Sequence, residues 1–385
     1  MTTCKKVVTH LLDEADIHIN GQNPWDISVE DERLFREVLR TKNLALGEGY
    51  VHGWWNCDHV DEFICRVLKS GAANHVHGNW KLAARVLPAL AFNLQSPSRA
   101  RTVAKKHYDL GNDLFQAFLD PYLQYSCGYF KGIPKRDFDT ATNEEVRADL
   151  EKAQQAKLRL ICEKLGLKPR ERLLDIGCGW GGLARFAAGK YGCEVVGVNI
   201  SREQITFARK FCSGLPVEIR EQDYRDLNEP FDKIVSVGMF EHVGQKNYTD
   251  YMKTVSRCLK PGGTFLLHTI GTNVTGPEID PWIEKYVFPN GNLPSLEQIA
   301  KASESLFVME DCHNFGPDYD RTLLSWLHNF RQSWPRLKDK YGESFRRMWE
   351  YYLQSCAGAF RARDIQLWQI AFTHIGDPQP DCRKA

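Results

Sequence analysis

A glycine-rich loop is the part of the sequence best suited to holding a small molecule. The segment LLDIGCGWGGLA, residues 173–184, has Asp175 near the end of an apolar run and then Gly177, Gly179 and Gly182. Glycines allow a backbone to approach a ligand closely at the carboxyl end of a strand. The G-x-G-x-x-G spacing alone is a weak signal, because a nucleotide-type cofactor and an ordinary turn are both compatible with it.

Three features favour S-adenosylmethionine over a dinucleotide as the cofactor. Trp180 adds bulk where a pyrophosphate needs bare backbone, and the second predicted strand ends in Asn199, where a nicotinamide site needs a carboxylate for the ribose. The sequence PGG at 261–263 precedes the last predicted strand, as is common in class I methyltransferases, which this stretch resembles.

That resemblance implies contacts along the cofactor, and in related enzymes the pair that corresponds to Tyr125 and Ser126 reaches the carboxylate of the methionine portion. The other implied contacts are Asp175, Gly177 and Gly179 at the methionine end, Asn199 and Gln204 at the ribose, and Gln222 and Asp223 at the adenine. The usual acid after the second strand is missing, which leaves Asn199 to hydrogen-bond a ribose hydroxyl.

The elements that must position these residues follow an alternating pattern over 150–272. Short β-branched runs alternate there with helical patterns, as in a parallel sheet with crossover helices. Long helices are predicted over 145–165 and 181–190. The predicted strands are 172–177, 194–200, 217–223, 233–240 and 264–270.

The flanking regions differ from this pattern. Residues 1 to about 105 are predicted to form short amphipathic helices without strands, and 272–330 is rich in Pro, Gly and aromatics, like a lid. Helical segments carrying Trp326, Trp334, Trp349 and Trp368 are predicted to follow. We therefore expect an α/β class I methyltransferase (Rossmann-like) doubly wound sheet in a catalytic domain, 106–385, beside a smaller all-helical N-terminal domain, 1–105.

Composition excludes several classes of protein. The chain has 385 residues, 43% hydrophobic and 26% charged, which excludes wholesale disorder and rods. A net charge of +1 and the lack of a motif argue against nucleic acid. Twelve cysteines without a C-x-x-C pair indicate reduced thiols, and His75-x-His77 lacks the partners of a metal site, so no metal is expected. The N-terminus is a poor signal peptide and no apolar run is long enough to span a bilayer, so we expect a cytoplasmic protein.

Seven motifs in order carry a resemblance that covers nearly the whole chain. They resemble those of bacterial cyclopropane-fatty-acyl-phospholipid synthases, which transfer the methyl group of S-adenosylmethionine to a cis double bond in a phospholipid acyl chain. The motifs are HYDLGNDLF (107–115), QYSCGYF (124–130), DIGCGWGGLA (175–184), VGMFEHVGQKNY (237–248), LLHTIG (266–271), GPDYDRTL (316–323) and CAGAFRARDIQLWQ (356–369).

The resemblance also implies how the reaction is completed. Attack by the alkene leaves a carbocation, and the new methyl group must lose a proton before the ring closes, so a base is needed. Family members hold bicarbonate as that base, and the matching residues here are Cys127, Glu241, His268 and Tyr319, with the backbone amide of Ile270. An anion beside Glu241 would be repelled unless the two share a proton. Cys356 matches a further cysteine near the catalytic set, to which we assign no nucleophilic role.

Each catalytic candidate also has an ordinary structural interpretation. Cys127 and Cys356 suit buried cysteines, His268 a core histidine, Glu241 a capping carboxylate and Tyr319 a packed tyrosine. Position favours the functional interpretation, because Glu241 and His268 end successive predicted strands at the edge where open α/β sheets bind ligands.

Two other functions stay open at this point. A relative with the same fold would methylate a small amine or add a plain methyl branch to a lipid, and an amine needs no base for ring closure. A non-catalytic lipid- or nucleotide-binding module is expected to have a broken glycine loop or a lost base cluster, and the sequence retains both.

A basic stretch offers a route to the lipid. Residues 81–106 carry six basic and no acidic side chains around an apolar stretch. This composition suits anionic headgroups on the inner face of a membrane, and it equally suits a solvated helix face packed on the core. The family resemblance also implies a homodimer formed through the N-terminal domain.

Overall fold

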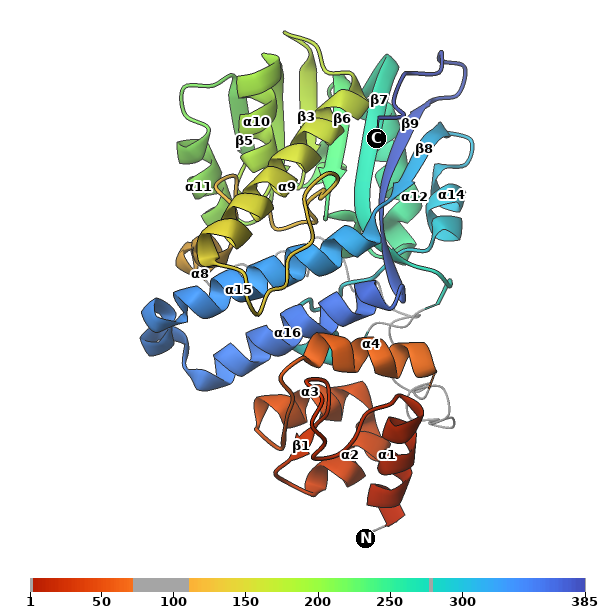
Figure 1. Cartoon of the computed structure of the whole chain (residues 1–385). Helices are drawn as coiled ribbons and strands as arrows, with labels where there is room; N and C mark the ends of the chain where they lie inside the picture. The colour runs from red at the N-terminus through yellow and green to blue at the C-terminus, as the bar shows by residue number, and fades with distance from the viewer. Residues whose placement is uncertain (1–2, 72–110, 277–279, 385) are drawn as a thin grey trace. The chain divides into compact units, whose positions relative to one another are not determined.

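The computed structural model describes residues 3–71, 111–276 and 280–384, which form two compact units (Figure 1). The helical unit contains the described residues of Met1–Phe92, Pro277–Pro289 and Tyr319–Ile365. The sheet unit contains those of Asn93–Gly276, Asn290–Asp318 and Gln366–Ala385. The boundary we predicted at 105 and the basic stretch at 81–106 lie outside the described residues. Among the helices described, none combines the length and apolar character needed to cross a bilayer.

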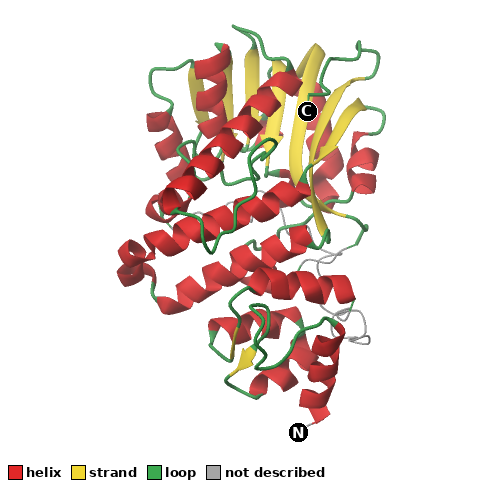
Figure 2. Cartoon of the chain, viewed as in Figure 1, coloured by secondary structure: helices red, strands yellow, loops and turns green. Residues whose placement is uncertain are grey.

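The sheet unit is built on one seven-stranded sheet (Figure 2) with the strand order β5-β4-β3-β6-β7-β9-β8. The pairs β3–β4, β4–β5, β3–β6 and β6–β7 are parallel, whereas β8 and β9 are antiparallel. The direction of strand addition reverses beside β3, which is where open α/β sheets bind their ligands. The strands are β3 (Arg172–Ile176), β4 (Glu194–Asn199), β5 (Val217–Glu221), β6 (Phe231–Val237), β7 (Leu259–Thr272), β8 (Phe307–Asn314) and β9 (Ile365–His374).

Helices bury both faces of this sheet. Thr142 and Glu145 form a capping box at the start of α9, and Gly166 ends that helix in a left-handed conformation. The helices of the sheet unit are α8 (Asn112–Phe118), α9 (Asn143–Leu165), α10 (Gly182–Tyr191), α11 (Arg202–Phe211), α12 (Tyr248–Cys258) and α14 (Leu296–Ser303), with short 3-10 turns η1 (Tyr224–Asp226), η2 (Phe240–His242) and η3 (Gln245–Asn247).

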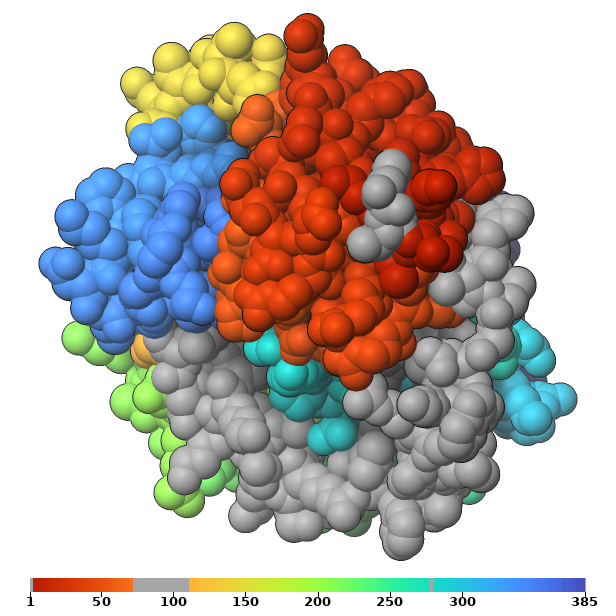
Figure 3. All heavy atoms as spheres, turned by 90° about the horizontal axis from the view of Figure 1, so that it is seen from below, coloured from red at the N-terminus to blue at the C-terminus, as the bar shows by residue number. Residues whose placement is uncertain are grey.

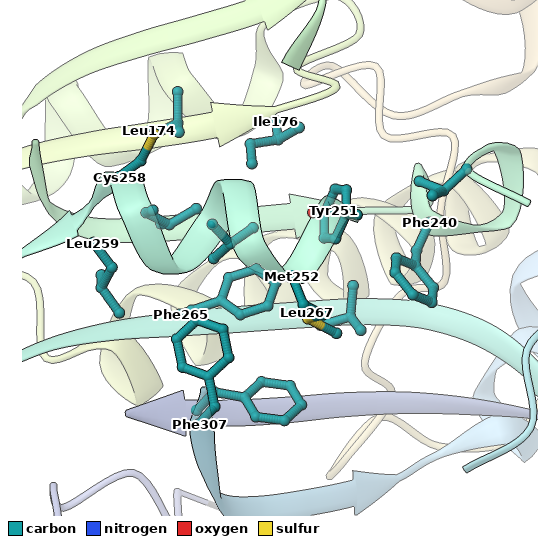
Figure 4. Close-up of a cluster of buried hydrophobic side chains, with 14 of the residues drawn as sticks. Leu174, Ile176, Phe240, Tyr251, Met252, Cys258, Leu259, Phe265, Leu267 and Phe307 are labelled. Atoms are coloured by element: carbon teal, nitrogen blue, oxygen red, sulfur yellow. The ribbon is translucent and has the colours of Figure 1, made fainter. Parts of the chain in front are cut away.

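Side chains of the central strands alternate between two cores. Leu174 of β3 and Leu267 of β7 pack with α12 in the cluster shown in Figure 4, whereas their neighbours Leu173 and Leu266 pack on the other face with α9 and α10. A strand buried on both faces appears as a continuous apolar run, which is why the parallel strands were found from the sequence. The five predicted strands are confirmed, with β7 beginning earlier than expected.

The helical unit joins segments that are far apart in the sequence. Gly358 of α16 lies so close to α4 that an added Cβ would be 2.4 Å from the Asp61 carbonyl oxygen. Figure 3 shows one face on which α15 and α16 (blue) adjoin the N-terminal helices (red). The elements are α1 (Thr3–Glu14), β1 (Ser28–Val29), α2 (Arg33–Thr41), α3 (Asn43–Val51), β2 (Trp55–Asn56), α4 (Val60–Ser70), α13 (Pro281–Tyr286), α15 (Gly316–Tyr341, from residue 319) and α16 (Glu343–Arg361).

Three of our expectations about the flanking regions were wrong. The N-terminal region is not free of strands, because β1 and β2 pair there as a two-residue antiparallel ladder. The predicted lid contains β8, an edge strand of the main sheet. Trp368 lies in β9 and not in a helix, because the preceding helix ends and the chain turns at Arg363, which has a φ of 62°. The sequence did not indicate this end of the helix, because no glycine or proline stands there.

Gly182, the first residue of α10, offers a stability test. A Cβ added there would lie 1.9 Å from the Tyr122 carbonyl oxygen, a backbone atom that cannot move alone. We expect Gly182→Ala to lower the free energy of unfolding by about 1–3 kcal/mol, as measured by urea denaturation. Gly189→Ala is the matched control in the same helix, because a Cβ there meets none of the described residues within 4 Å, and it should be neutral or raise stability by up to ~1 kcal/mol. Equal changes in the free energy of unfolding for the two variants would contradict the close approach of α10 to the backbone at Tyr122.

Candidate active site

The glycine loop lies between β3 and α10, at the carboxyl end of β3. Gly177, Gly179 and Gly181 have φ values of 84°, 53° and 81°, a region that favours glycine. A Cβ on Gly177 would be 2.8 Å from the side chain of Met239, in the segment after β6. Trp180 is buried against Phe115 and its indole donates to Asn112 Oδ1 at 2.8 Å, so this side chain anchors the loop.

Asp175 is buried in β3 just before this loop. Its Oδ2 has no hydrogen-bond partner among the residues the structure describes. Burial raises the pKa of this carboxyl to about 7, against the opposing charge of Lys157. A buried polar atom without a partner is costly, so Asp175 is suited to pair with a polar or cationic group of a ligand.

The residues predicted for the ribose and adenine ends of the cofactor form one connected set. Asn199 at the end of β4 donates from Nδ2 to the Gly179 carbonyl at 3.3 Å and to Gln204 Oε1 at 2.9 Å. The backbone N–H of Gln222 donates to the backbone carbonyl of Asn199 at 3.1 Å. Asp223 caps η1 and forms an ion pair with Arg225 at 2.7 Å. Asn199 therefore links the glycine loop to the residues at the ends of β4 and β5.

Tyr125 and Ser126 lie in a segment held by α9. The Tyr125 ring contacts the edges of Phe115 and Phe118, with centroids 5.2 and 6.2 Å away. Ser126 is buried, and its carbonyl accepts a hydrogen bond from Gln154 Nε2 of α9 at 2.8 Å.

Lys157 is a site residue that our sequence reasoning missed. It is fully buried on α9 and donates from Nζ to Gln124 Oε1 at 2.5 Å and to Ser126 Oγ at 2.8 Å. Burial lowers its pKa to about 8, although the Asp120, Cys127 and Asp175 charges act in the opposite direction. A signal was present, because Lys157 occupies the buried face of α9, at helical spacing from Leu150 and Ala153.

Glu241 is buried in η2, which begins three residues after the end of β6. Its Oε1 accepts a hydrogen bond from the Ile270 amide at 2.7 Å, whereas its Oε2 has no partner among the described residues. Burial raises the pKa of this carboxyl to about 7, although the bond from Ile270 favours the charged form. Near neutral pH Glu241 can therefore be present with or without its proton, which a proton-transfer group requires.

His268 lies within β7, two residues before Ile270, and is also buried. Its Nδ1 is 3.2 Å from Gln369 Nε2 of β9, and its Nε2 has no partner among the described residues. With the Gln369 amide in this orientation, its nitrogen donates to Nδ1 and the ring proton belongs on Nε2. Burial holds the pKa of His268 well below its usual value, so the ring is a neutral donor at Nε2.

The remaining candidates divide between the two units. Cys127 is buried in the sheet unit, where its Sγ lies 3.1 Å from the Gly128 carbonyl oxygen. Tyr319 and Cys356 belong to the helical unit. The Tyr319 ring stacks on Phe360 with centroids 4.5 Å apart, and burial raises the pKa of Cys356 to about 12, which leaves that thiol protonated. Within the described ranges, no group of three His, Cys, Asp or Glu side chains could hold a metal ion.

Sequence comparison finds matches that span most of the chain. Residues 95–370 match the family model of mycolic acid cyclopropane synthetase. The chain is also 55% identical over 368 residues to the cyclopropane-fatty-acyl-phospholipid synthase of Escherichia coli (strain K12), covering 96% of this chain and 93% of that protein.

Solved structures agree with this likeness. The mycolic acid cyclopropane synthase CmaA1, complexed with SAH and CTAB, superposes with a TM-score of 0.63 at 30% identity, covering 71% of this chain and 97% of that one. Coclaurine N-methyltransferase has a TM-score of 0.67 at 21% identity, covering 85% and 98%. The second likeness shows a shared fold and nothing about the substrate.

Proposed function

The chain belongs to the mycolic acid cyclopropane synthetase family, and on that premise we propose that it is a cyclopropane-fatty-acyl-phospholipid synthase that uses S-adenosylmethionine as co-substrate. The observation that carries this assignment is the 55% identity over 96% of the chain to the Escherichia coli synthase. The name of that relative describes a phospholipid with a cyclopropane in a fatty acyl chain as the product. The proposed substrate is therefore a phospholipid acyl chain with a cis double bond, as the family resemblance implies.

The reaction needs a base as well as a methyl donor. The alkene attacks the sulfonium methyl group, and a C–C bond forms as the C–S bond breaks. S-Adenosylhomocysteine is the leaving group, and the acyl chain then bears a carbocation. A base then removes one proton from the new methyl group, and the electron pair of that C–H bond closes the ring. Methylation of an amine leaves no carbocation and no ring to close, so a base cluster favours an alkene substrate over an amine.

We propose that bicarbonate is that base and that Glu241 and His268 hold it. Glu241 Oε2 and His268 Nε2 are buried polar atoms without partners among the described residues, and β7 bears both His268 and the amide that bonds Glu241. His268 can donate to the anion, and Glu241 can share a proton with it because burial places its pKa at about 7. The roles of Cys127, Ile270, Tyr319 and Cys356 rest on the family resemblance alone.

For the co-substrate, the proposal places the methionine end at Asp175, Gly177 and Gly179. Gly177 leaves no room for a Cβ, which would lie 2.8 Å from the Met239 side chain. Asp175 has a buried carboxyl oxygen without a partner among the described residues. Tyr125, Ser126, Asn199, Gln204, Gln222 and Asp223 complete the proposed contacts. We also propose that the enzyme is a homodimer. It contacts the membrane surface through the basic stretch at 81–106.

Product analysis tests the proposal. The purified protein is incubated with S-adenosylmethionine and vesicles of cis-monounsaturated phospholipid, and the acyl chains are examined by proton NMR. Loss of olefinic protons with the appearance of upfield ring protons is the expected result, and removal of bicarbonate should slow it at least about tenfold. A branch methyl or unchanged lipid would overturn the assignment, and a rate independent of bicarbonate would overturn the choice of base. Co-sedimentation with anionic vesicles that does not weaken with salt would contradict contact through basic residues.

A further inference from the structure

The buried lysine on α9 has no role in the reaction as described so far. Lys157 has no exposed surface, and two of its three Nζ donors are taken by Gln124 Oε1 at 2.5 Å and Ser126 Oγ at 2.8 Å. Neither acceptor is charged, and Lys157 forms no ion pair in the described part of the chain. Burying an ammonium group without an ion-pair partner is costly, so this charge needs a reason that packing does not provide.

The surrounding groups show where this charge acts. The carboxyls of Asp120 and Asp175 and the thiol of Cys127 favour the protonated lysine, and the lysine charge in turn reaches His268. Asp120 is already satisfied, because its two oxygens accept from the amides of Tyr122 and Gln124 at 2.8 Å. Lys157 is therefore a buried positive charge in contact with the segment that bears Ser126.

Its hydrogen bond also fixes the direction of the Ser126 hydroxyl. A hydroxyl has one proton and two lone pairs, and an ammonium can only donate. Since Ser126 Oγ accepts from Lys157, the hydroxyl proton points elsewhere, and no acceptor for it occurs among the described residues. Gln154, one helical turn before Lys157, holds the Ser126 carbonyl at 2.8 Å. Gln154 and Lys157 thus hold Ser126 so that its hydroxyl can donate a hydrogen bond, while its oxygen contacts the positive charge of Lys157.

We propose that Lys157 is a positioning residue that acts through the Ser126 hydroxyl on the carboxylate of the methionine portion of S-adenosylmethionine. This inference rests on the proposed function, which supplies the co-substrate and places Ser126 at that carboxylate. A donor held in place by a buried cation forms a charge-assisted hydrogen bond to an anion, which is stronger than a neutral one. The lysine itself is behind the serine and touches no ligand atom in this scheme.

Two ligands that differ in the carboxylate separate this role from a structural one. S-Adenosylhomocysteine carries the amino-acid portion, and 5′-methylthioadenosine lacks it, so both bind the adenosine part but only one has the carboxylate. We expect Lys157→Met to weaken S-adenosylhomocysteine binding about 10–100-fold by isothermal titration calorimetry, and to change methylthioadenosine binding less than about threefold. Ser126→Ala should show the same selectivity, and the double variant should be no weaker than Ser126→Ala.

A second buried lysine on the same helix is the matched control. Lys164 has no exposed side-chain surface and pairs with Asp311 at 2.8 Å, so Lys164→Met also removes a buried charge. It should alter stability without changing the ratio of the two affinities. If Lys157→Met does not retain its circular dichroism spectrum, Lys157→Gln, which keeps a donor without the charge, is compared in its place.

Equal losses for both ligands in the Lys157 variants, or unchanged binding of S-adenosylhomocysteine, would overturn the inference. Additive effects of Lys157→Met and Ser126→Ala would also overturn it, because the lysine would then act by a separate route. Failure of the wild-type protein to bind S-adenosylhomocysteine at all would instead refute the proposed function, so the two failures are distinguishable.

Discussion

Replacing Glu241 by alanine is expected to lower the rate of cyclopropane formation about 10³-fold, within the range that proton-transfer groups contribute. The substitution removes the buried carboxyl that accepts from the Ile270 amide at 2.7 Å and leaves the proposed anion without its proton partner. Glutamine should cost less, about 10²-fold, because its amide keeps a donor but cannot pass a proton on. Rates are measured from the NMR assay under saturating co-substrate.

The matched control for Glu241 is Glu310 of β8. Both carboxyls are buried in the sheet unit, and Glu310 accepts hydrogen bonds from Thr373 at 2.6 Å and Gln379 at 3.2 Å. Glu310→Ala should leave the rate within about threefold of wild type, and Glu241→Ala should leave S-adenosylhomocysteine affinity within the same limit. A near-normal rate for Glu241→Ala would remove this residue from the base site.

The pH dependence of the rate gives Glu241 a signature of its own. Burial raises the pKa of this carboxyl to about 7, so above neutral pH it becomes charged in the folded protein. A charged carboxylate repels bicarbonate, and the wild-type rate should therefore fall as pH rises through 7. Glutamine cannot ionise, so the fall should be absent in Glu241→Gln. If the variant keeps the same fall, another group is responsible for it.

Local sequence patterns were enough for the central sheet and for most of the candidate site. Strands β3, β4, β6 and β7 contain apolar runs, and chain order places the glycine loop after β3 and Glu241 after β6. His268 lies within β7 and pairs with Val237, the last residue of β6, so it reaches the same edge of the sheet. The motif positions of the family supplied Tyr125 and Ser126. What these patterns cannot show is which side chain bonds which.

The residues that the sequence missed depend on contacts between distant segments. Gln369 was part of a quoted motif, but its bond to His268 depends on β9 adjoining β7 in the sheet, 101 residues away in the chain. The helical spacing of Lys157 from Leu150 and Ala153 is compatible with a buried position, but its hydrogen bond to Ser126, 31 residues away, is visible only in the fold. The predicted helical domain, 1–105, was incomplete for the same reason. Helices α15 and α16 belong to the same unit although they lie near the other end of the sequence.

His268 leads to the second large effect, because its neutral ring has a single task in the proposed site. Gln369 donates to Nδ1, which leaves the proton on Nε2, and a fixed donor aimed at an anion in a buried site is worth about 10²–10³ in rate. We expect His268→Phe, which keeps a ring but has no donor, to lower the rate about 10²-fold and to leave S-adenosylhomocysteine binding unchanged. The NMR assay and calorimetry measure the two quantities.

The control for this substitution is another histidine of the same sheet. His374 of β9 stacks on Phe307 and lies 3.1 Å from the Leu259 carbonyl oxygen, so His374→Phe also removes a hydrogen-bonded imidazole. It should lower stability but keep the rate. Because burial holds the pKa of His268 well below its usual value, His268→Phe should also keep the fall in rate near pH 7 that Glu241 causes. Loss of that fall in His268→Phe would assign the titration to the histidine and reverse the two roles.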